Sequence, residues 1–142
     1  MLSWDEHVRN GTIRKDAPNT GKIIALIKIA DARINTMSKI KADKNNSSII
    51  FTNYYDSLRE ICEAAASLKG YKIYLHEAIG LFLKNILNEE AIYSKFDRYR
   101  IMRNRVNYYG NLIPIEETLE AIKEINQIIE KLKTKYLAEF LR

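Results

Sequence analysis

Apolar residues recur at spacings of three and four along most of this chain, and no segment sustains the alternation of a β-strand. This spacing places apolar side chains on one face of an α-helix, so it predicts an all-α fold. Only two prolines interrupt the 142 residues, which leaves room for long helices. The sequence therefore predicts an up-and-down bundle of four to five helices joined by short connections.

Glycine, proline and polar clusters mark the ends of the expected helices. The expected helices cover about residues 20–42, 48–69, 72–87, 88–109 and 114–140. Residues 1–19, which include Gly11 and Pro18, are expected to form an irregular lead. The length is that of one domain that buries a core without disulfides, so residues 1–142 are expected to form one helical domain with the bundle over 20–142.

The single cysteine, Cys62, excludes an internal disulfide framework and is typical of a reducing, cytoplasmic setting. The longest apolar stretch is far shorter than the ~20 residues of a membrane-spanning helix. The first residues lack the basic-then-apolar pattern of a signal peptide. We therefore expect a cytoplasmic protein with no membrane partner.

Positive charge is concentrated in two regions. The net charge is +5, yet residues 95–105 alone hold five bases and one acid, and residues 9–44 hold nine bases and three acids. Four of the nine arginines lie between positions 98 and 105. Because the planar guanidinium suits phosphate, this clustering favours RNA or a nucleotide as partner, although a solvated helix face would have the same composition.

A helical wheel separates these arginines from one another. Arg98 and Arg105 fall on one flank of the apolar arc, and Arg100 and Asn107 fall on the other. Arg103 projects inside the arc, where an unpaired guanidinium would cost several kcal/mol. It is therefore either half of a structural salt bridge to another helix or part of an anion site.

Other candidate residues carry weaker signals. His76 lies at the edge of the apolar stripe of the expected third helix, and it is either a structural residue or a catalyst. Eight of the nine tyrosines lie between residues 54 and 109, where they either stack on bases or pack in the core. The chain has no glycine-rich phosphate loop, no metal-ligand spacing of Cys and His, and no nucleophile elbow, so we expect no cofactor and no metal site.

The run from Phe96 to Gly110, FDRYRIMRNRVNYYG, resembles the fourth-helix signature of the HEPN family, in particular of small archaeal HEPN-like proteins. Residues 4–18, 55–64 and 70–77 are similar to the same group. The resemblance therefore spans nearly the whole chain.

The resemblance implies a helical bundle that usually pairs as a symmetric homodimer. Many members are metal-independent endoribonucleases or RNA-binding modules, often the toxin partner of a minimal nucleotidyltransferase antitoxin. The family motif is an arginine, a polar residue directly after it, and a histidine beyond four to six intervening residues. Arg103 and Asn104 match the first two positions. Tyr108 stands at the first histidine position, and no histidine follows.

This departure weakens the enzymatic expectation. Cleavage of RNA by attack of the 2′-hydroxyl needs a base with a pKa near neutrality and a cation for the developing charge. Arg103 could supply the cation, whereas the phenol of Tyr108 is a poor base at pH 7. Any enzymatic activity would be that of a metal-independent endoribonuclease with a non-standard active site, and His76 is the alternative base.

The sequence therefore predicts a HEPN-type bundle that binds RNA or a nucleotide, with degenerate or absent ribonuclease activity, as the toxin-like partner of a nucleotidyltransferase. Arg103 is expected to clamp the phosphate beside Asn104, with Tyr108 in place of the histidine. Arg100 and Asn107 are further expected phosphate contacts. The competing hypothesis is a non-catalytic subunit that docks a nucleotidyltransferase through an apolar face.

Overall fold

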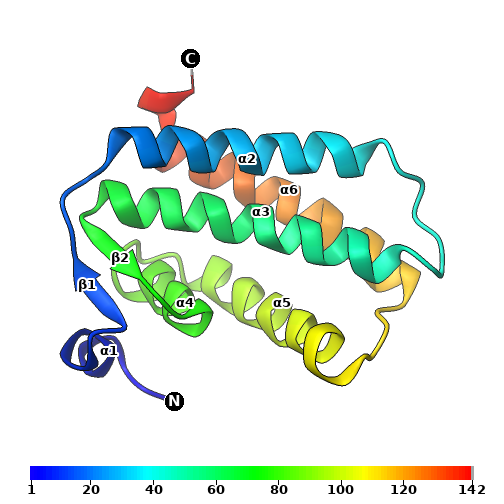
Figure 1. Ribbon diagram of the computed structural model, residues 1–142, viewed down its shortest axis with the longest axis horizontal. Helices are drawn as coiled ribbons and strands as arrows, with labels where there is room; N and C mark the ends of the chain where they lie inside the picture. Colours follow the sequence, from blue (N-terminus) through cyan, green and yellow to red (C-terminus); the bar gives the residue numbers. More distant parts are fainter. Residues whose placement is uncertain (142) are drawn as a thin grey trace.

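A computed structural model describes residues 1–141, and α-helices dominate it (Figure 1). Along the chain the elements are α1 (Trp4–Asn10), β1 (Ile13–Lys15), α2 (Thr20–Ser38), α3 (Ser47–Leu68), β2 (Tyr71–Ile73), α4 (His76–Asn85), α5 (Glu90–Tyr109), α6 (Ile115–Tyr136) and the short 3₁₀ helix η1 (Ala138–Phe140). The expected all-α bundle is confirmed. Within the described residues, no helix is both long and apolar enough to cross a membrane.

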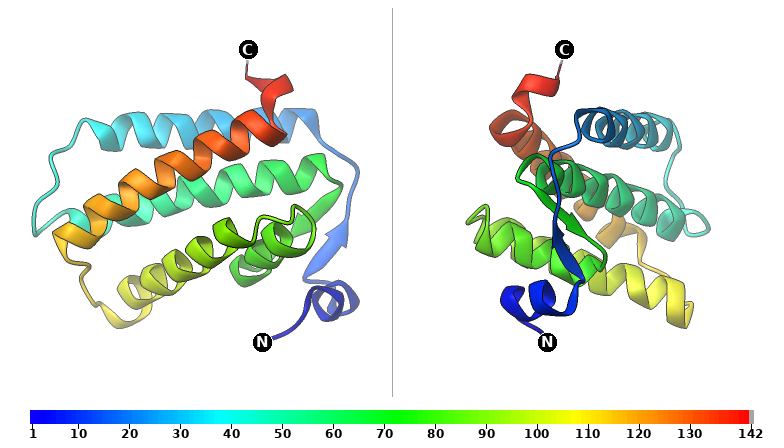
Figure 2. Two further views of the ribbon diagram at one scale, coloured as in Figure 1. Left: turned by 180° about the vertical axis from the view of Figure 1, so that it is seen from behind. Right: turned by 60° about the vertical axis from the view of Figure 1, so that its left-hand side comes forward.

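Helix α3 lies at the centre of the bundle. Helices α2 and α6 pack along it, whereas α4 and α5 pack against each other on another side (Figures 1 and 2). Its apolar face is fully buried at Leu58 and Ile61, because these residues meet the apolar stripes of the neighbouring helices. The α5–α6 loop is tied to the start of α3, where Ser47 Oγ donates to the Ile113 carbonyl at 2.9 Å and the Ile113 amide donates to Ser48 Oγ at 2.8 Å.

The expectation of an irregular lead over residues 1–19 is wrong, because this segment contains a helix and a strand. Ser3 and Glu6 form a capping box that starts α1, with each side chain bonded to the other residue's amide at 3.2 Å. Strand β1 then pairs antiparallel with β2, with buried Ile13 opposite Ile73. Strands of three residues are too short to give an alternating pattern, so periodicity missed both of them.

The expected third helix over 72–87 is also corrected, because its first residues form β2. Gly70 has a φ of +87°, the left-handed conformation that lets α3 end and the chain turn back as a strand. The Gly70 carbonyl then accepts a 2.9 Å hydrogen bond from the Asp16 amide. Helix α4 begins only at His76, so this histidine lies in the first turn rather than along a mid-helix stripe. Helix α2 also ends four residues early, at Ser38.

Glu89 connects the start of α5 to the end of α6, and its contacts predict that the fold loses stability at acid pH. Its carboxylate accepts hydrogen bonds from Lys135 at 2.6 Å, Tyr136 at 2.7 Å and Lys131 at 3.1 Å. Burial would raise the pKa of Glu89, but these donors outweigh it and lower the pKa from 4.5 to about 2. Because the pKa of Glu89 is lower in the folded protein than in the unfolded chain, its ionised carboxylate stabilises the fold above pH 4.5. This contribution is lost as the pH falls toward 2.

We therefore expect the parent to lose more stability than Glu89→Gln when urea unfolding is compared at pH 5 and pH 2.5. Glu130→Gln, which changes an exposed carboxylate of helix α6 and leaves the Glu89 contacts in place, is the control and should follow the parent. An equal loss in the parent and Glu89→Gln would contradict the prediction.

Candidate anion-binding cleft

An open cleft of about 400 Å³ lies between the start of α4 and the C-terminal half of α5. We call it the α4–α5 cleft. Its lining residues come from the β2–α4 connection, the first turn of α4 and one face of α5; they are Tyr74, Leu75, His76, Glu77, Arg100, Arg103, Asn104 and Tyr108. The structure thus brings together five of the six site residues that the sequence predicted. Asn107 is exposed and lies outside the lining.

Close packing beneath the cleft brings the two helices together. A Cβ at Gly80 of α4 would lie only 3.2 Å from the Tyr93 ring of α5, so glycine permits this approach. Phe96 of α5 is fully buried, and its ring centroid lies 5.6 Å from that of Tyr55 on α3. Closely packed side chains of α3, α4 and α5 therefore form the base of the cleft, and the polar side chains of the cleft lie on this base.

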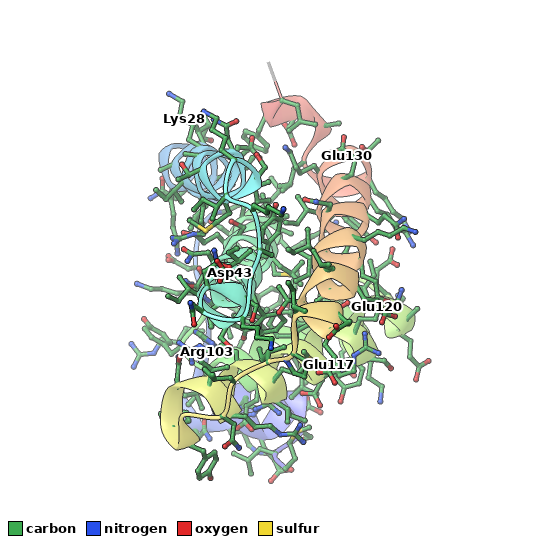
Figure 3. All side chains as sticks on the ribbon, turned by 90° about the vertical axis from the view of Figure 1, so that its right-hand side faces the viewer. Lys28, Asp43, Arg103, Glu117, Glu120 and Glu130 are labelled. Atoms are coloured by element: carbon green, nitrogen blue, oxygen red, sulfur yellow. The ribbon has the colours of Figure 1, made fainter. Side chains whose placement is uncertain are left out.

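Arg103 is half-buried and has no ion pair within residues 1–141. Its guanidinium lies 6.0 Å from the centroid of the Tyr55 ring, a cation–π distance. In Figure 3 it lies well apart from Glu117 and Glu120 of α6. The salt bridge to another helix that the sequence left open as an alternative is therefore absent from the described part of the chain, and the charge of Arg103 is available to a ligand.

The other arginines of α5 have carboxylates close by. Arg100, which also lines the cleft, bonds to Asp97 on its own helix at 2.9 Å and 3.1 Å. Arg98 bonds to Glu124 of α6 at 2.7 Å. Arg105 faces the same groove as Arg98, together with Glu117, Glu120 and Glu124. The helical wheel therefore separated the flanks correctly, because Arg98 and Arg105 face α6 and Arg100 faces α4.

His76 is held by a buried tyrosine. The Tyr55 hydroxyl lies 3.1 Å from His76 Nδ1, and the Tyr55 side chain is fully buried. Burial raises the pKa of Tyr55, so the phenol keeps its proton. A buried hydroxyl hydrogen needs an acceptor, and Nδ1 is its one hydrogen-bond partner among the described residues. We therefore assign the phenol as the donor and the proton of neutral His76 to Nε2. Nε2 is not buried and has no partner in the described structure.

The cleft disfavours protonation of His76. Burial is the largest cause, followed by the positive charges of Arg59 and Arg103, and together they lower its pKa to about 4. At pH 7 the imidazole is neutral and presents an Nε2–H donor, and its low basicity is unsuited to a general base. With the guanidinium donors of Arg100 and Arg103, His76 makes the cleft rich in hydrogen-bond donors. Such a set can hold an anion.

Glu77 is the carboxylate of the cleft and was missed by sequence reasoning as a site residue. Its Oε1 atom lies 3.8 Å from Nε2 of His7, a fully buried histidine of α1. The Nδ1 atom of His7 lies 2.6 Å from Thr12 Oγ1. The pair Glu77 and His7 therefore joins α1 to the wall of the cleft. The only sequence signal for Glu77 was its place beside His76.

Tyr74 and Leu75 also line the cleft and were not predicted as site residues. They follow β2, and the position of this strand depends on its pairing with β1. Tyr108 is 71% exposed, at the open edge. Within residues 1–141 its phenol forms no hydrogen bond, so the described geometry gives it no base to activate it.

Comparisons of this chain with protein-family models, with curated proteins and with solved structures found no match. Within residues 1–141, no group of three or more His, Cys, Asp or Glu side chains is placed to hold a metal ion. The function is therefore argued from the cleft itself.

Proposed function

We propose that this protein binds single-stranded RNA through phosphate contacts in the α4–α5 cleft, as a HEPN-type module. The observation that carries the proposal is Arg103, a half-buried guanidinium with no carboxylate partner in the described structure, in an open cleft. An unpaired and partly desolvated cation is stabilised by an anion, and a guanidinium matches phosphate in a bidentate geometry.

The surroundings of Arg103 support phosphate as the ligand. Arg100 adds a second guanidinium, and the Nε2–H group of His76 adds a neutral donor. The cleft also borders the N-terminus of α4, whose N-cap Leu75 provides no side-chain acceptor for the free amides. Tyr108, exposed at the rim, offers a ring on which an unpaired base can stack.

Ribonuclease activity is proposed to be degenerate or absent. Tyr108 stands in place of the motif histidine and is a poor base at pH 7. His76, the alternative base, has a pKa near 4 and is held through Nδ1 by Tyr55. The cleft therefore has the cation for a phosphorane-like charge but no side chain matched to removing the 2′-hydroxyl proton.

The test is RNA binding by Arg103→Gln against Arg105→Gln, measured by fluorescence anisotropy with a single-stranded RNA at low salt. Arg105 is the matched control, because it lies on the same helix and faces the acidic groove toward α6. We expect Arg103→Gln to weaken binding by about tenfold or more and Arg105→Gln by about twofold at most. Equal effects, or a parent that does not bind RNA at low salt, would contradict the proposal.

A second candidate is the protein-binding subunit that docks a nucleotidyltransferase. The observation in its favour is the exposed tip at the C-terminal end of α5, where Tyr109, the last residue of the helix, is 76% exposed and Leu112 of the following loop is 72% exposed. Large exposed apolar side chains are typical of protein interfaces. Salt separates the two functions, because phosphate binding weakens steeply as salt rises whereas docking of an apolar face does not.

A further inference from the structure

Two cations lie directly opposite each other on the β1–β2 sheet. Arg14 of β1 is in register with Lys72 of β2, and both side chains are exposed. Neither forms an ion pair within residues 1–141, and the one side-chain hydrogen bond of Arg14 runs to the Gly11 carbonyl at 3.2 Å. We call these residues the sheet pair. Like charges directly opposite on antiparallel strands repel each other, so this arrangement reduces stability unless an anion lies between them.

Tyr74 connects the sheet pair to the α4–α5 cleft. The Arg14 guanidinium and the Lys72 ammonium lie 5.4 Å and 5.3 Å from the centroid of the Tyr74 ring. The same tyrosine lines the cleft with Arg103. Tyr74 therefore joins the sheet pair to the cleft, and Glu77, the acidic residue of the cleft lining, forms no ion pair with Arg14, Lys72 or Arg103 among the described residues. The sheet and the cleft form one basic track.

We infer that the sheet pair is a second phosphate subsite, which holds a neighbouring phosphate of the strand whose first phosphate is bound beside Arg103. This inference rests on the proposed function and names the ligand more closely, as a strand of several nucleotides. A mononucleotide would fill the cleft and leave Arg14 and Lys72 unpaired. An extended single strand presents one charge per nucleotide and neutralises both groups of cations.

The experiment compares Arg14→Gln/Lys72→Gln with the charge-matched control Lys39→Gln/Lys41→Gln. Lys39 and Lys41 are exposed and lie after α2, at the other end of the bundle from the sheet (Figure 1). The two probes, at low salt and pH 7, are adenosine monophosphate and a single-stranded RNA of about twelve uridines. For the sheet variant we expect RNA affinity to fall about tenfold and the slope of log affinity on log salt to decrease by about 1.4.

The same variant is expected to bind adenosine monophosphate within about twofold of the parent, because that ligand occupies the cleft alone. Its melting temperature should not fall, since the substitutions remove a like-charge repulsion, and this checks folding. If RNA binding falls no further than in the control while Arg103→Gln abolishes it, the sheet pair is not a subsite and the cleft proposal stands. If the parent binds neither probe, both proposals fail.

Discussion

Replacing Arg33 by methionine is expected to lower the free energy of unfolding by about 3 kcal/mol at pH 7. Arg33 of α2 bonds to both carboxylate oxygens of Glu60 on α3, at 3.2 Å each, and to Asn53 Oδ1 at 3.1 Å. Glu60 is only 6% exposed. Removing the arginine leaves a buried carboxylate without its counter-charge, which is the costly way to break such a pair. Because the Arg33 side chain is partly exposed, we expect a loss at the low end of the roughly 3–5 kcal/mol that breaking a buried ion pair costs.

Urea unfolding of three variants tests this expectation. The double variant Arg33→Met/Glu60→Met should recover most of the loss, because two apolar side chains replace both charges. Lys133→Met is the control, since Lys133 pairs at 2.9 Å with Asp31, whose side chain is 49% exposed. Loss of that pair should cost less than about 1 kcal/mol. A loss below about 1 kcal/mol in Arg33→Met as well would mean that Glu60 is stabilised by other groups.

The pairing of Arg33 also shows why a sum of charges over a segment could not locate the candidate anion site. It counts toward the basic region of residues 9–44, yet its charge is matched by Glu60, which lies 27 positions further along the chain. Arg14 belongs to the same region and has no carboxylate partner in the described structure. The sequence presents the two residues alike, because the difference depends on which helix or strand packs against each.

The long helices were predictable because their apolar spacing repeats over several turns, as along α3. The strands were not, because each has three residues and depends on a partner more than 50 positions away. The start of α1 was readable in principle from Ser3 and Glu6, whose spacing is that of a capping box. Gly11 and Pro18, which predict an irregular segment, lie outside both α1 and β1.

The candidate site was predictable on α5 and incomplete elsewhere. A wheel needs only one helix, so it separated Arg100 from Arg98 and Arg105. It placed Arg103 within the apolar arc, and the structure finds it half-buried against the ring of Tyr55. A helical wheel describes the faces of one helix, so it cannot predict which residues form the opposite wall of the cleft. Tyr74 and Glu77 lie there because β2 pairs with β1 and because Gly80 lets α4 approach α5.

Occupation of the cleft by a phosphate is expected to raise the pKa of His76 from about 4 to between about 5 and 7. In the free protein, burial and the charges of Arg59 and Arg103 disfavour the imidazolium. A bound anion supplies the opposite charge and reverses the effect of the arginines. The measurement is an NMR titration of the His76 ring protons, with and without a saturating single-stranded RNA, whose diester phosphates stay charged throughout the range.

Two variants locate the effect. Arg103→Gln should raise the pKa of His76 in the free protein, because it removes one of the cations that lower it, and should reduce the response to RNA. Arg105 faces the groove on the α6 side, so Arg105→Gln should leave the titrations of His76 with and without RNA unchanged. An unaltered pKa of His76 at saturating RNA in the parent would mean that the phosphate binds away from this cleft.

The sign of the shift also fixes how binding depends on pH. A ligand that raises the pKa of His76 binds the protonated protein more tightly, so RNA affinity should increase as the pH falls from 7 toward 4. A general base would give the opposite dependence for cleavage, since the neutral imidazole would be the active form. Tighter binding at acid pH without cleavage would therefore identify His76 as a donor to phosphate. Cleavage that rises with pH and disappears in His76→Ala would identify it as a base.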